Sequence, residues 1–272
     1  MNAAISVVVT TYNWPEALEA CLQSLLAQRD DDFEIIVADD GSTAATQELV
    51  KRMMKNSPIP ISHVYHEDRG FRAGGIRNKA VAAARGTYLL FVDGDCVMLP
   101  NFIARHRLLA EPGYFVPGNR LLLNRVLTNQ VIQEKIQLHQ QSIFFFLVNW
   151  LKRDINRLLP LLYLPWHHWR YRNPQGWQKA MTCNLAVWKT DFIAVNGFDE
   201  CFEGWGYEDS DLAIRLIHQN IKRKEGRFAI PVLHLWHRQN DRSQHDVNYQ
   251  RLLARVNDKS LTRAQLGVDQ YL

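Results

Sequence analysis

The 272-residue sequence contains no apolar run of the length that crosses a bilayer, about 18 residues. Its four cysteines lie far apart and form no CxxC pair, so we expect reduced thiols and neither a disulfide framework nor a zinc site. The chain enters the apolar run Ile5–Val9 without a basic n-region or a cleavage site, which argues against a signal peptide. Together these absences predict a cytoplasmic protein.

The signature loops of several enzyme classes are also missing. The first apolar run is not followed by GxGxxG, and the glycines of Gly70–Gly75 have the wrong spacing for it. The motifs GxxxxGK[ST], GxSxG and HExxH are absent. These absences disfavour hydride transfer, P-loop hydrolysis, serine hydrolysis and zinc proteolysis. The net charge of +4 fits an anionic ligand or membrane surface, and we predict no nucleic-acid partner.

What the first hundred residues do contain is an alternation of short apolar runs and helical patterns. Such apolar runs are typical of strands buried on both faces. We expect strands at Ile5–Val9, Phe33–Ala38, Ile61–His66 and Tyr88–Val92. We expect helices after an N-cap at Asn13, after Ser42 or Thr43, and over Ala73–Arg85. The repeated βαβ pattern predicts an α/β fold, with a mainly parallel, Rossmann-like sheet covered by helices.

The residue pattern changes beyond residue 120. Aromatic-rich helical segments are expected at 143–147 and Leu158–Trp169, and strand–helix patterns return at Met181–Trp188, Asp209–Gln219 and Arg227–Leu235. We therefore divide the chain into residues 1–120, a helical lobe at 121–178, a second half at 179–240 and a tail at 241–272.

Polar residues follow each expected strand. They are Thr10 to Asn13, Asp39 and Asp40, His66 to Asp68, Asp93 to Asp95, and, after the late strand, His234 and His237. Ligands of open α/β sheets bind outside the carboxyl ends of the strands. Five strand ends with Thr, Asp or His predict a binding site at this edge.

The segment Asp93-Gly94-Asp95 is the most specific of these strand ends. Two carboxylates separated by one glycine can face one hard cation such as Mg²⁺ or Mn²⁺, which keeps positions open for substrate phosphates. The alternative is a solvated turn, because Asp-Gly is a common turn dipeptide. Its position after a buried strand, beside similar strand ends, favours the metal site.

A second acidic cluster, Glu208, Asp209 and Asp211, lies at the start of an expected helix. Acids at a helix N-terminus stabilise the helix dipole and cap free N–H groups, so a structural role remains open, above all for Asp211. The preceding Trp205 and Tyr207 offer flat faces of the kind that stack on sugar rings. The cluster is thus a candidate for either sugar chemistry or helix capping.

The segments Ser6–Asn13, Phe33–Ser42 and Tyr88–Asp95 resemble the family 2 glycosyltransferases of the GT-A fold. The later segment Cys183–Leu212 is similar to the C-terminal motif of β-1,4-galactosyltransferases and bacterial polysaccharide synthases. The resemblance implies inverting, Mn²⁺- or Mg²⁺-dependent transfer of a sugar from a nucleoside diphosphate to an acceptor hydroxyl. Residues 1–120 would then be the nucleotide-sugar-binding half, 179–240 the acceptor-binding and catalytic half, and 121–178 an acceptor-side lobe.

The same resemblance implies roles for individual residues. Asp209 would be the general base, with Glu208 as its catalytic neighbour binding donor or acceptor hydroxyls. The implied metal ligands are Asp95, Asp93, His237 and His234. The implied nucleotide contacts are Thr10, Thr11, Tyr12, Asp39, Arg72, Arg77 and Asp93. The implied sugar and acceptor contacts are Trp205, Gly206, Tyr207 and Asn184. Tyr207 departs from the family pattern, which has glycine there.

The resemblance implies transfer of a hexose or N-acetylhexosamine from a UDP-sugar to an acceptor saccharide, in synthesis of a bacterial cell-surface glycan such as lipopolysaccharide or capsule. One alternative is a sugar-phosphate nucleotidyltransferase, although the glycine-rich basic loop of that class is absent after the first strand. Another is a non-catalytic sugar-binding module, which would be expected to lose the acids that are present here.

Residues 125–175 fall outside the resemblance and leave two interpretations open. Basic residues and Trp150, Trp166 and Trp169 flank short apolar runs, as in helices that lie in a membrane interface or bind a lipid-linked acceptor. The other interpretation is a helical lobe packed on the sheet. The first would make the protein peripheral at the inner membrane.

Overall fold

The computed structural model describes residues 4–165, 168–238 and 241–272, so Trp166 lies outside the described residues. Its strands are β1 (Ile5–Thr11), β2 (Phe33–Asp39), β3 (Ile61–Tyr65), β4 (Tyr88–Asp93), β5 (Cys96–Met98), β6 (Tyr114–Pro117), β7 (Asn119–Leu122), β8 (Asn184–Trp188), β9 (Lys222–Arg223) and β10 (Pro231–His234). Its α-helices are α1 (Pro15–Leu26), α2 (Ala44–Asn56), α3 (Ala73–Ala83), α4 (Phe102–Leu109), α5 (Arg125–Gln133), α6 (Ile143–Leu151), α7 (Lys189–Ala194), α8 (Glu208–His218) and α9 (His245–Asn257).

The main sheet has the strand order β3-β2-β1-β4-β8-β6-β9. The pairs β1–β2, β2–β3 and β1–β4 are parallel, whereas β8 runs antiparallel to both β4 and β6. The expected α/β fold with a mainly parallel, helix-covered sheet is confirmed. Because β8 and β9 belong to this sheet, residues from the second half of the chain extend the sheet begun by the first.

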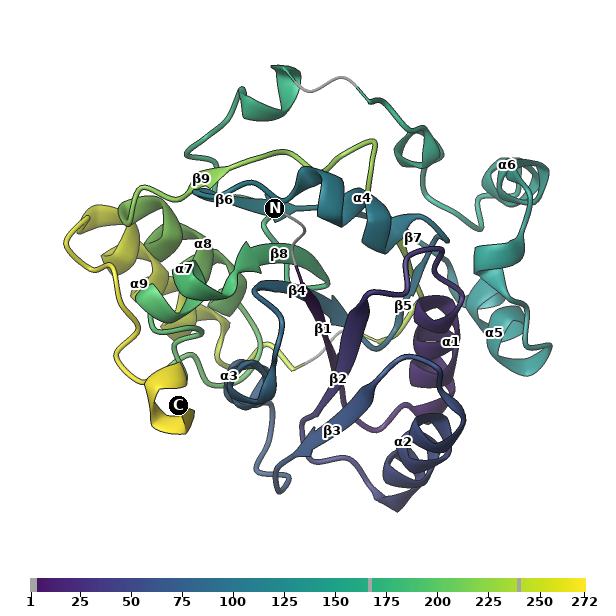
Figure 1. Ribbon diagram of the computed structural model, residues 1–272, viewed down its shortest axis with the longest axis horizontal. Helices are drawn as coiled ribbons and strands as arrows, with labels where there is room; N and C mark the ends of the chain where they lie inside the picture. Colours follow the sequence, from purple (N-terminus) through teal and green to yellow (C-terminus); the bar gives the residue numbers. More distant parts are fainter. Residues whose placement is uncertain (1–3, 166–167, 239–240) are drawn as a thin grey trace.

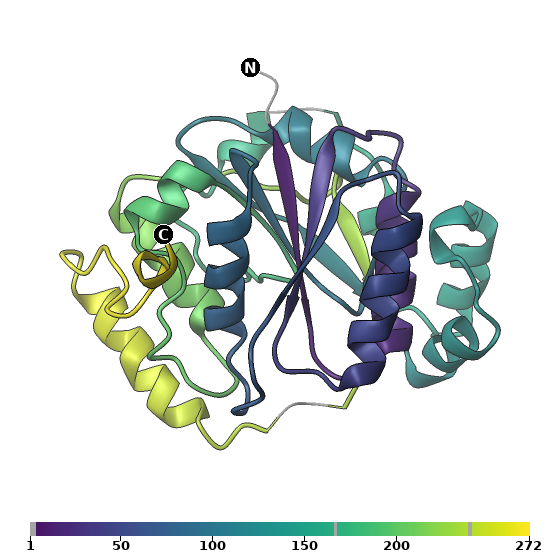
Figure 2. The same ribbon diagram turned by 60° about the horizontal axis from the view of Figure 1, so that its bottom comes forward.

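Apolar side chains cover both faces of the main sheet. Val7 and Val9 of β1 pack with α1 and α2, and the intervening Val8 packs with α3, α7 and α8. Figure 2 shows α1 and α2 on one side of the sheet and α3 on the other. This double burial explains why the strands are continuous apolar runs rather than alternating ones.

A second sheet, in the order β5-β10-β7, lies at the carboxyl end of β4. In this sheet, β5, which directly follows Asp95, pairs with β10, which ends at His234. The expected late strand Arg227–Leu235 is therefore shorter than predicted and belongs to this small sheet.

Two local predictions were wrong. Asn13 does not cap α1, whose N-cap is Trp14. Asn13 has φ 48° and its side-chain oxygen instead accepts a hydrogen bond from the Thr43 amide, so it ties two loops together. The segment Leu158–Trp169 is not one helix but contains the short 3-10 helices Leu159–Leu161 and His168–Tyr171. Pro160 and Pro165 cannot donate the amide hydrogen bonds of a continuous helix.

Candidate active site

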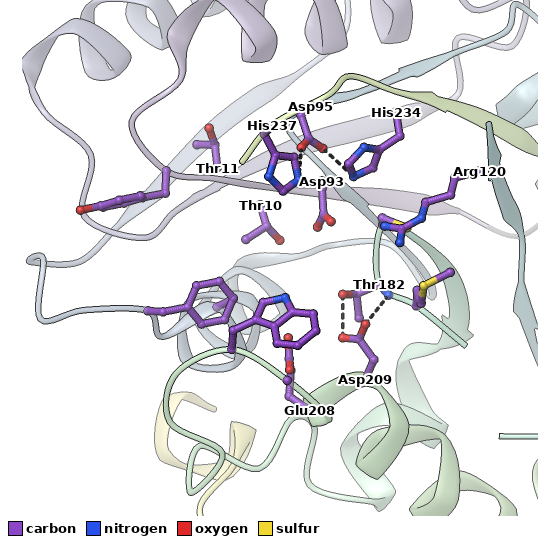
Figure 3. A pocket seen from close by; sticks show the side chains of 18 of the residues that line it. Thr10, Thr11, Asp93, Asp95, Arg120, Thr182, Glu208, Asp209, His234 and His237 are labelled. Atoms are coloured by element: carbon purple, nitrogen blue, oxygen red, sulfur yellow. Dashed lines mark hydrogen bonds and ion pairs between the residues drawn. The ribbon is translucent and has the colours of Figure 1, made fainter. Parts of the chain in front are cut away.

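A cavity of about 780 Å³ lies over the carboxyl ends of β1 and β4. Its walls include both Asp-rich segments and the two histidines singled out in the sequence. Figure 3 shows Asp95, His234 and His237 along one wall and Glu208 and Asp209 across the cavity from them. The fold thus gathers residues from positions 10 to 242 around one space.

Asp95, His234 and His237 form a cluster whose ligand atoms all lie within 4.8 Å of one another. The His234 Nε2 atom is 3.6 Å from one Asp95 oxygen, and the His237 Nε2 atom is 3.4 Å from the other. One carboxylate and two imidazoles converging in this way can hold a divalent transition metal. The sequence left open which histidine approaches Asp95, and the structure brings both.

Strand pairing produces this cluster. In the antiparallel β5–β10 pair, His234 lies opposite Cys96, and the Leu235 amide donates to the Asp95 carbonyl at 2.9 Å. Gly94 lies against Thr10 and Thr11, and a Cβ atom there would come within 3.2 Å of both residues. The glycine between the two aspartates therefore allows the chain to turn closely over the end of β1.

Asp93 does not join the metal cluster but pairs with Arg77. The buried Arg77 guanidinium donates to an Asp93 oxygen at 3.1 Å and to the Thr10 hydroxyl at 2.9 Å. It also lies 3.5 Å from Glu208 and 4.0 Å from Asp209. Burial raises the pKa of Asp93 above its ordinary value, against the opposing effect of Arg77. Arg77 is thus a cation shared by three carboxylates of the cavity.

Asp209 is held at the start of α8 by Thr182. One oxygen of the Asp209 carboxylate accepts from the Thr182 hydroxyl at 2.8 Å, and the other accepts from the Thr182 amide at 3.1 Å. Burial raises the pKa of Asp209. Burial and then the charge of Asp209 raise the pKa of Glu208 to about 7. Two neighbouring carboxyl groups thus differ in orientation and in hydrogen bonding.

The turn before α8 has at position 207, where this chain departs from the family pattern, a backbone conformation that favours glycine. Tyr207 has φ 72°, in the left-handed region that favours glycine. Its side chain is held by a 2.9 Å hydrogen bond between its hydroxyl and His245 and by contact with the Tyr249 ring. Trp205, on the same turn, faces the Arg242 guanidinium, which lies 4.8 Å from its ring centroid.

Most of the residues expected in the site line the cavity. The group comprises Thr10, Thr11, Tyr12, Arg77, Asp93, Asp95, Trp205, Gly206, Tyr207, Glu208, Asp209, His234 and His237. Tyr12 is exposed, and its hydroxyl donates to Asp68 at 2.8 Å. Asp211 lies outside this group and is buried against Arg215 and Arg255, as a scaffold residue would be.

Three expected site residues are not among those that line the cavity. The Asp39 carboxylate is buried and binds His63 and the Ser42 amide. The Asn184 side chain is buried and donates to the Asn119 and Ile230 carbonyls, so its amide group is already occupied. Arg72 donates through its guanidinium to the Glu67 carbonyl. In the structure these three side chains thus bind other protein groups, and their roles in binding nucleotide or acceptor stay predictions.

Other cavity residues were given no role in the site by the sequence analysis. Asp40 lines the cavity and accepts from the Arg72 amide, and Arg120 enters from β7. Thr182 positions Asp209 from a distance of 27 residues. The pair Asp39-Asp40 did mark a strand end, but Thr182 and Arg120 carry no local signal because only tertiary contacts bring them here.

The sequence matches two family models. Residues 6–157 match glycosyl transferase family 2, and residues 163–237 match the model described as the N-terminal domain of galactosyltransferase. Validoxylamine A glucosyltransferase from Streptomyces hygroscopicus is 28% identical over 228 residues, which cover 78% of this chain and 51% of the relative. Chondroitin synthase from Escherichia coli is 26% identical over 250 residues, covering 83% of this chain and 34% of that protein. The chain thus spans about half the length, or less, of these curated relatives.

Solved structures with the same fold cover 98% of this chain. A mannosyltransferase from Pyrobaculum calidifontis, in complex with GDP-Man and Mn²⁺, gives a TM-score of 0.60 at 17% identity over 66% of its own chain. S. aureus TarS 1–349 in complex with UDP-GlcNAc gives 0.61 at 13% identity over 69% of its chain. These similarities confirm the GT-A type of fold.

Proposed function

This chain belongs to glycosyl transferase family 2, and we propose that it transfers a hexose or N-acetylhexosamine from a UDP-sugar to a saccharide hydroxyl with inversion at the sugar. The observation that carries the proposal is the placement of two different acidic groups on opposite walls of one cavity. Asp95 lies with His234 and His237, and Glu208 and Asp209 lie across from them.

The Asp95 cluster fits a divalent cation. Its three ligand atoms lie within 4.8 Å of one another, and most of the Asp95 side chain is shielded from solvent. A carboxylate with two imidazoles suits Mn²⁺ better than Mg²⁺, which prefers oxygen ligands. When bound, such a cation neutralises charge on a departing diphosphate.

The chain's own residues supply the remaining steps. Asp209 is proposed as the general base that takes the proton from the attacking acceptor hydroxyl, because Thr182 fixes its two oxygens at the cavity wall. Attack from this wall, opposite the leaving diphosphate, inverts the anomeric centre. With a pKa near 7, Glu208 can donate or accept a hydrogen bond to a sugar hydroxyl. Arg77 offsets the charge of the gathered carboxylates.

The donor side of the cavity supports binding of a nucleoside diphosphate. Thr10, Thr11 and Tyr12 at the end of β1 would contact the nucleotide, and Trp205 offers an aromatic face to a sugar. The structural relatives carry GDP-Man or UDP-GlcNAc, which supports the same donor class here. We further propose that the acceptor belongs to a bacterial cell-surface glycan, in line with the polysaccharide-synthase resemblance of the second half.

The test removes the proposed metal ligand. In Asp95→Ala we expect no Mn²⁺-dependent UDP binding by calorimetry and no release of UDP from UDP-sugars, while the circular dichroism spectrum is unchanged. EDTA should have the same effect on the unmodified protein. Asp31→Ala, which alters an exposed acid remote from the cavity, is the matched control. Full activity of Asp95→Ala, or of the protein in EDTA, would overturn the metal-dependent mechanism.

A further inference from the structure

Helix α6 turns its most apolar side to solvent. Its exposed side chains are Ile143, Phe144, Leu147, Trp150 and Leu151. At 100° per residue these five positions fall within an arc of about 120° on one side of the helix. Phe144 is 69% exposed, and Ile143 and Leu151 are each 67% exposed. A contiguous face of large apolar residues on a surface helix indicates a binding surface rather than isolated exposed residues.

The opposite side of α6 packs on the protein. Phe146 is buried in a cluster with Leu127 and Leu138, and Phe145 packs against the same cluster. Asn149, on this side of the helix, is also buried. The helix therefore cannot rotate to bury its apolar face without breaking this packing. Figures 1 and 2 show α5 and α6 at the edge of the molecule, beyond α1.

Basic residues border the apolar face. Lys152, Arg153 and Arg157 follow α6 and are exposed. Asp154 is the one acid between residues 141 and 165, and its carboxylate accepts from the Asn124 side chain at 2.7 Å. An apolar helical face next to exposed cations complements an anionic lipid surface, where apolar groups enter the interface and cations meet phosphate headgroups. A second copy of the chain would offer this segment the same cations and only one acid, Asp154.

The segment after α6 is joined to the cavity wall. Ile155 pairs with Leu123, and the Asn156 amide donates to the Leu122 carbonyl at 3.1 Å. The Arg157 guanidinium donates to the carbonyl of Arg120 at 2.6 Å. Since Arg120, Leu122 and Leu123 line the cavity, the apolar face and the active-site cavity are connected through one short segment.

We propose that α6 and its basic flank form a membrane-docking surface that seats the protein on an anionic bilayer, with the cavity beside it receiving an acceptor saccharide carried on a lipid. The second part rests on the proposed glycosyl transfer. Among the described residues, none of the helices is long and apolar enough to cross a membrane, so docking would be peripheral. Stable attachment combines burial of apolar area with attraction to anionic lipids, and here the face of α6 would supply the first and the nearby cations the second.

Flotation of the full chain with lipid vesicles tests the surface. We expect the protein to float with vesicles of phosphatidylcholine and phosphatidylglycerol at low salt, and at least about tenfold less with pure phosphatidylcholine or at high salt. Phe144→Glu with Leu151→Glu should reduce flotation at least about tenfold. Lys152→Glu with Arg153→Glu should reduce it by a similar factor on anionic vesicles. Because the altered side chains are exposed, melting curves should show intact folding.

The matched control is Val247→Glu, an exposed apolar residue on α9 at the other end of the molecule, which should float like the unmodified protein. Protein that stays with the soluble fraction at low salt, or equal flotation of the Phe144→Glu/Leu151→Glu variant, would overturn the proposal. The proposal would also be overturned if light scattering showed a dimer that the Phe144→Glu/Leu151→Glu variant dissociates, because the apolar face would then be a subunit interface.

Mn²⁺-dependent UDP binding, measured without lipid, separates this proposal from the proposed function. Retained UDP binding without flotation would overturn the docking surface alone. Flotation without UDP binding would overturn the nucleotide-sugar chemistry and, with it, the lipid-carried acceptor, while docking itself would stand.

Discussion

Asp209 and Glu208 are adjacent in sequence, yet their carboxyl groups have different surroundings. Both oxygens of Asp209 accept hydrogen bonds from Thr182, whereas Glu208 faces Arg77 across 3.5 Å. Two fixed hydrogen bonds orient Asp209 toward the cavity. This difference is why we propose Asp209 as the base and Glu208 as the group that binds hydroxyls.

Asp209→Asn tests that separation. The asparagine has nearly the same shape and can still accept a hydrogen bond from Thr182, but it cannot take up the acceptor proton. We expect turnover to fall by about 10²-fold or more, the usual size of a general-base contribution, with UDP binding unchanged. The measurement is UDP release alongside calorimetry. Turnover close to that of the unmodified protein would move the base to Glu208.

Glu208 makes stability depend on pH. Its pKa is raised from 4.5 to about 7 by burial and by Asp209, so the folded state holds this proton more tightly than the unfolded state does. Stability from this group is therefore present at low pH and is lost as pH rises through about 7. We expect the melting temperature of Glu208→Gln, relative to that of the unmodified protein, to increase as the pH is raised from 5 to 8. A constant difference across that range would contradict the raised pKa.

At the scale of elements, the first turn of α8 carries one acid that lines the cavity and another that is buried in an ion-pair network. Asp209, at the start of α8, faces the cavity. Asp211, two residues later, is buried and forms two ion pairs. One, at 2.6 Å, is with Arg215 of the same helix, and the other, at 3.0 Å, is with Arg255 of α9. The helix N-terminus favours acids at both positions because of its dipole. Which acid faces the cavity and which is buried against Arg215 and Arg255 follows from the rotation of the helix.

Asp211→Asn should therefore destabilise the fold without affecting the chemistry. Neutralising one partner leaves the fully buried Arg215 without its counter-charge, which costs about 3–5 kcal/mol in comparable buried pairs. Chemical denaturation measures this loss. At low temperature the folded variant should keep Mn²⁺-dependent UDP binding, and loss of binding by well-folded protein would place Asp211 in the site.

At the scale of the whole molecule, the cavity joins both halves of the chain, from Thr10 to Arg242. A ligand that bridges its walls stabilises the folded state as a unit. UDP with Mn²⁺ at 100 times its dissociation constant adds about 2.7 kcal/mol, which is roughly 5–10 °C in melting temperature for a domain of this size. Differential scanning fluorimetry measures the shift. It should vanish in EDTA and in Asp95→Ala, and an equal shift in either would contradict metal-assisted binding.

The sequence by itself determined strands β1 to β4 and helices α1 to α3, though not β5, α4 and β6, and it marked the strand ends that carry polar groups of the cavity. Strands such as β1 and β4 are apolar on both faces, a local pattern, and Asp93-Gly94-Asp95 places its acids at a strand end without further information. Tertiary structure alone decided which polar groups share the cavity. Strand register brings His234 beside Asp95, whereas Asp93 pairs with Arg77 and Asn184 is occupied by backbone carbonyls. It also decided that the apolar face of α6 points to solvent, because α6 has large apolar residues on both its exposed and its buried side, which gives no local signal of which side the protein will cover.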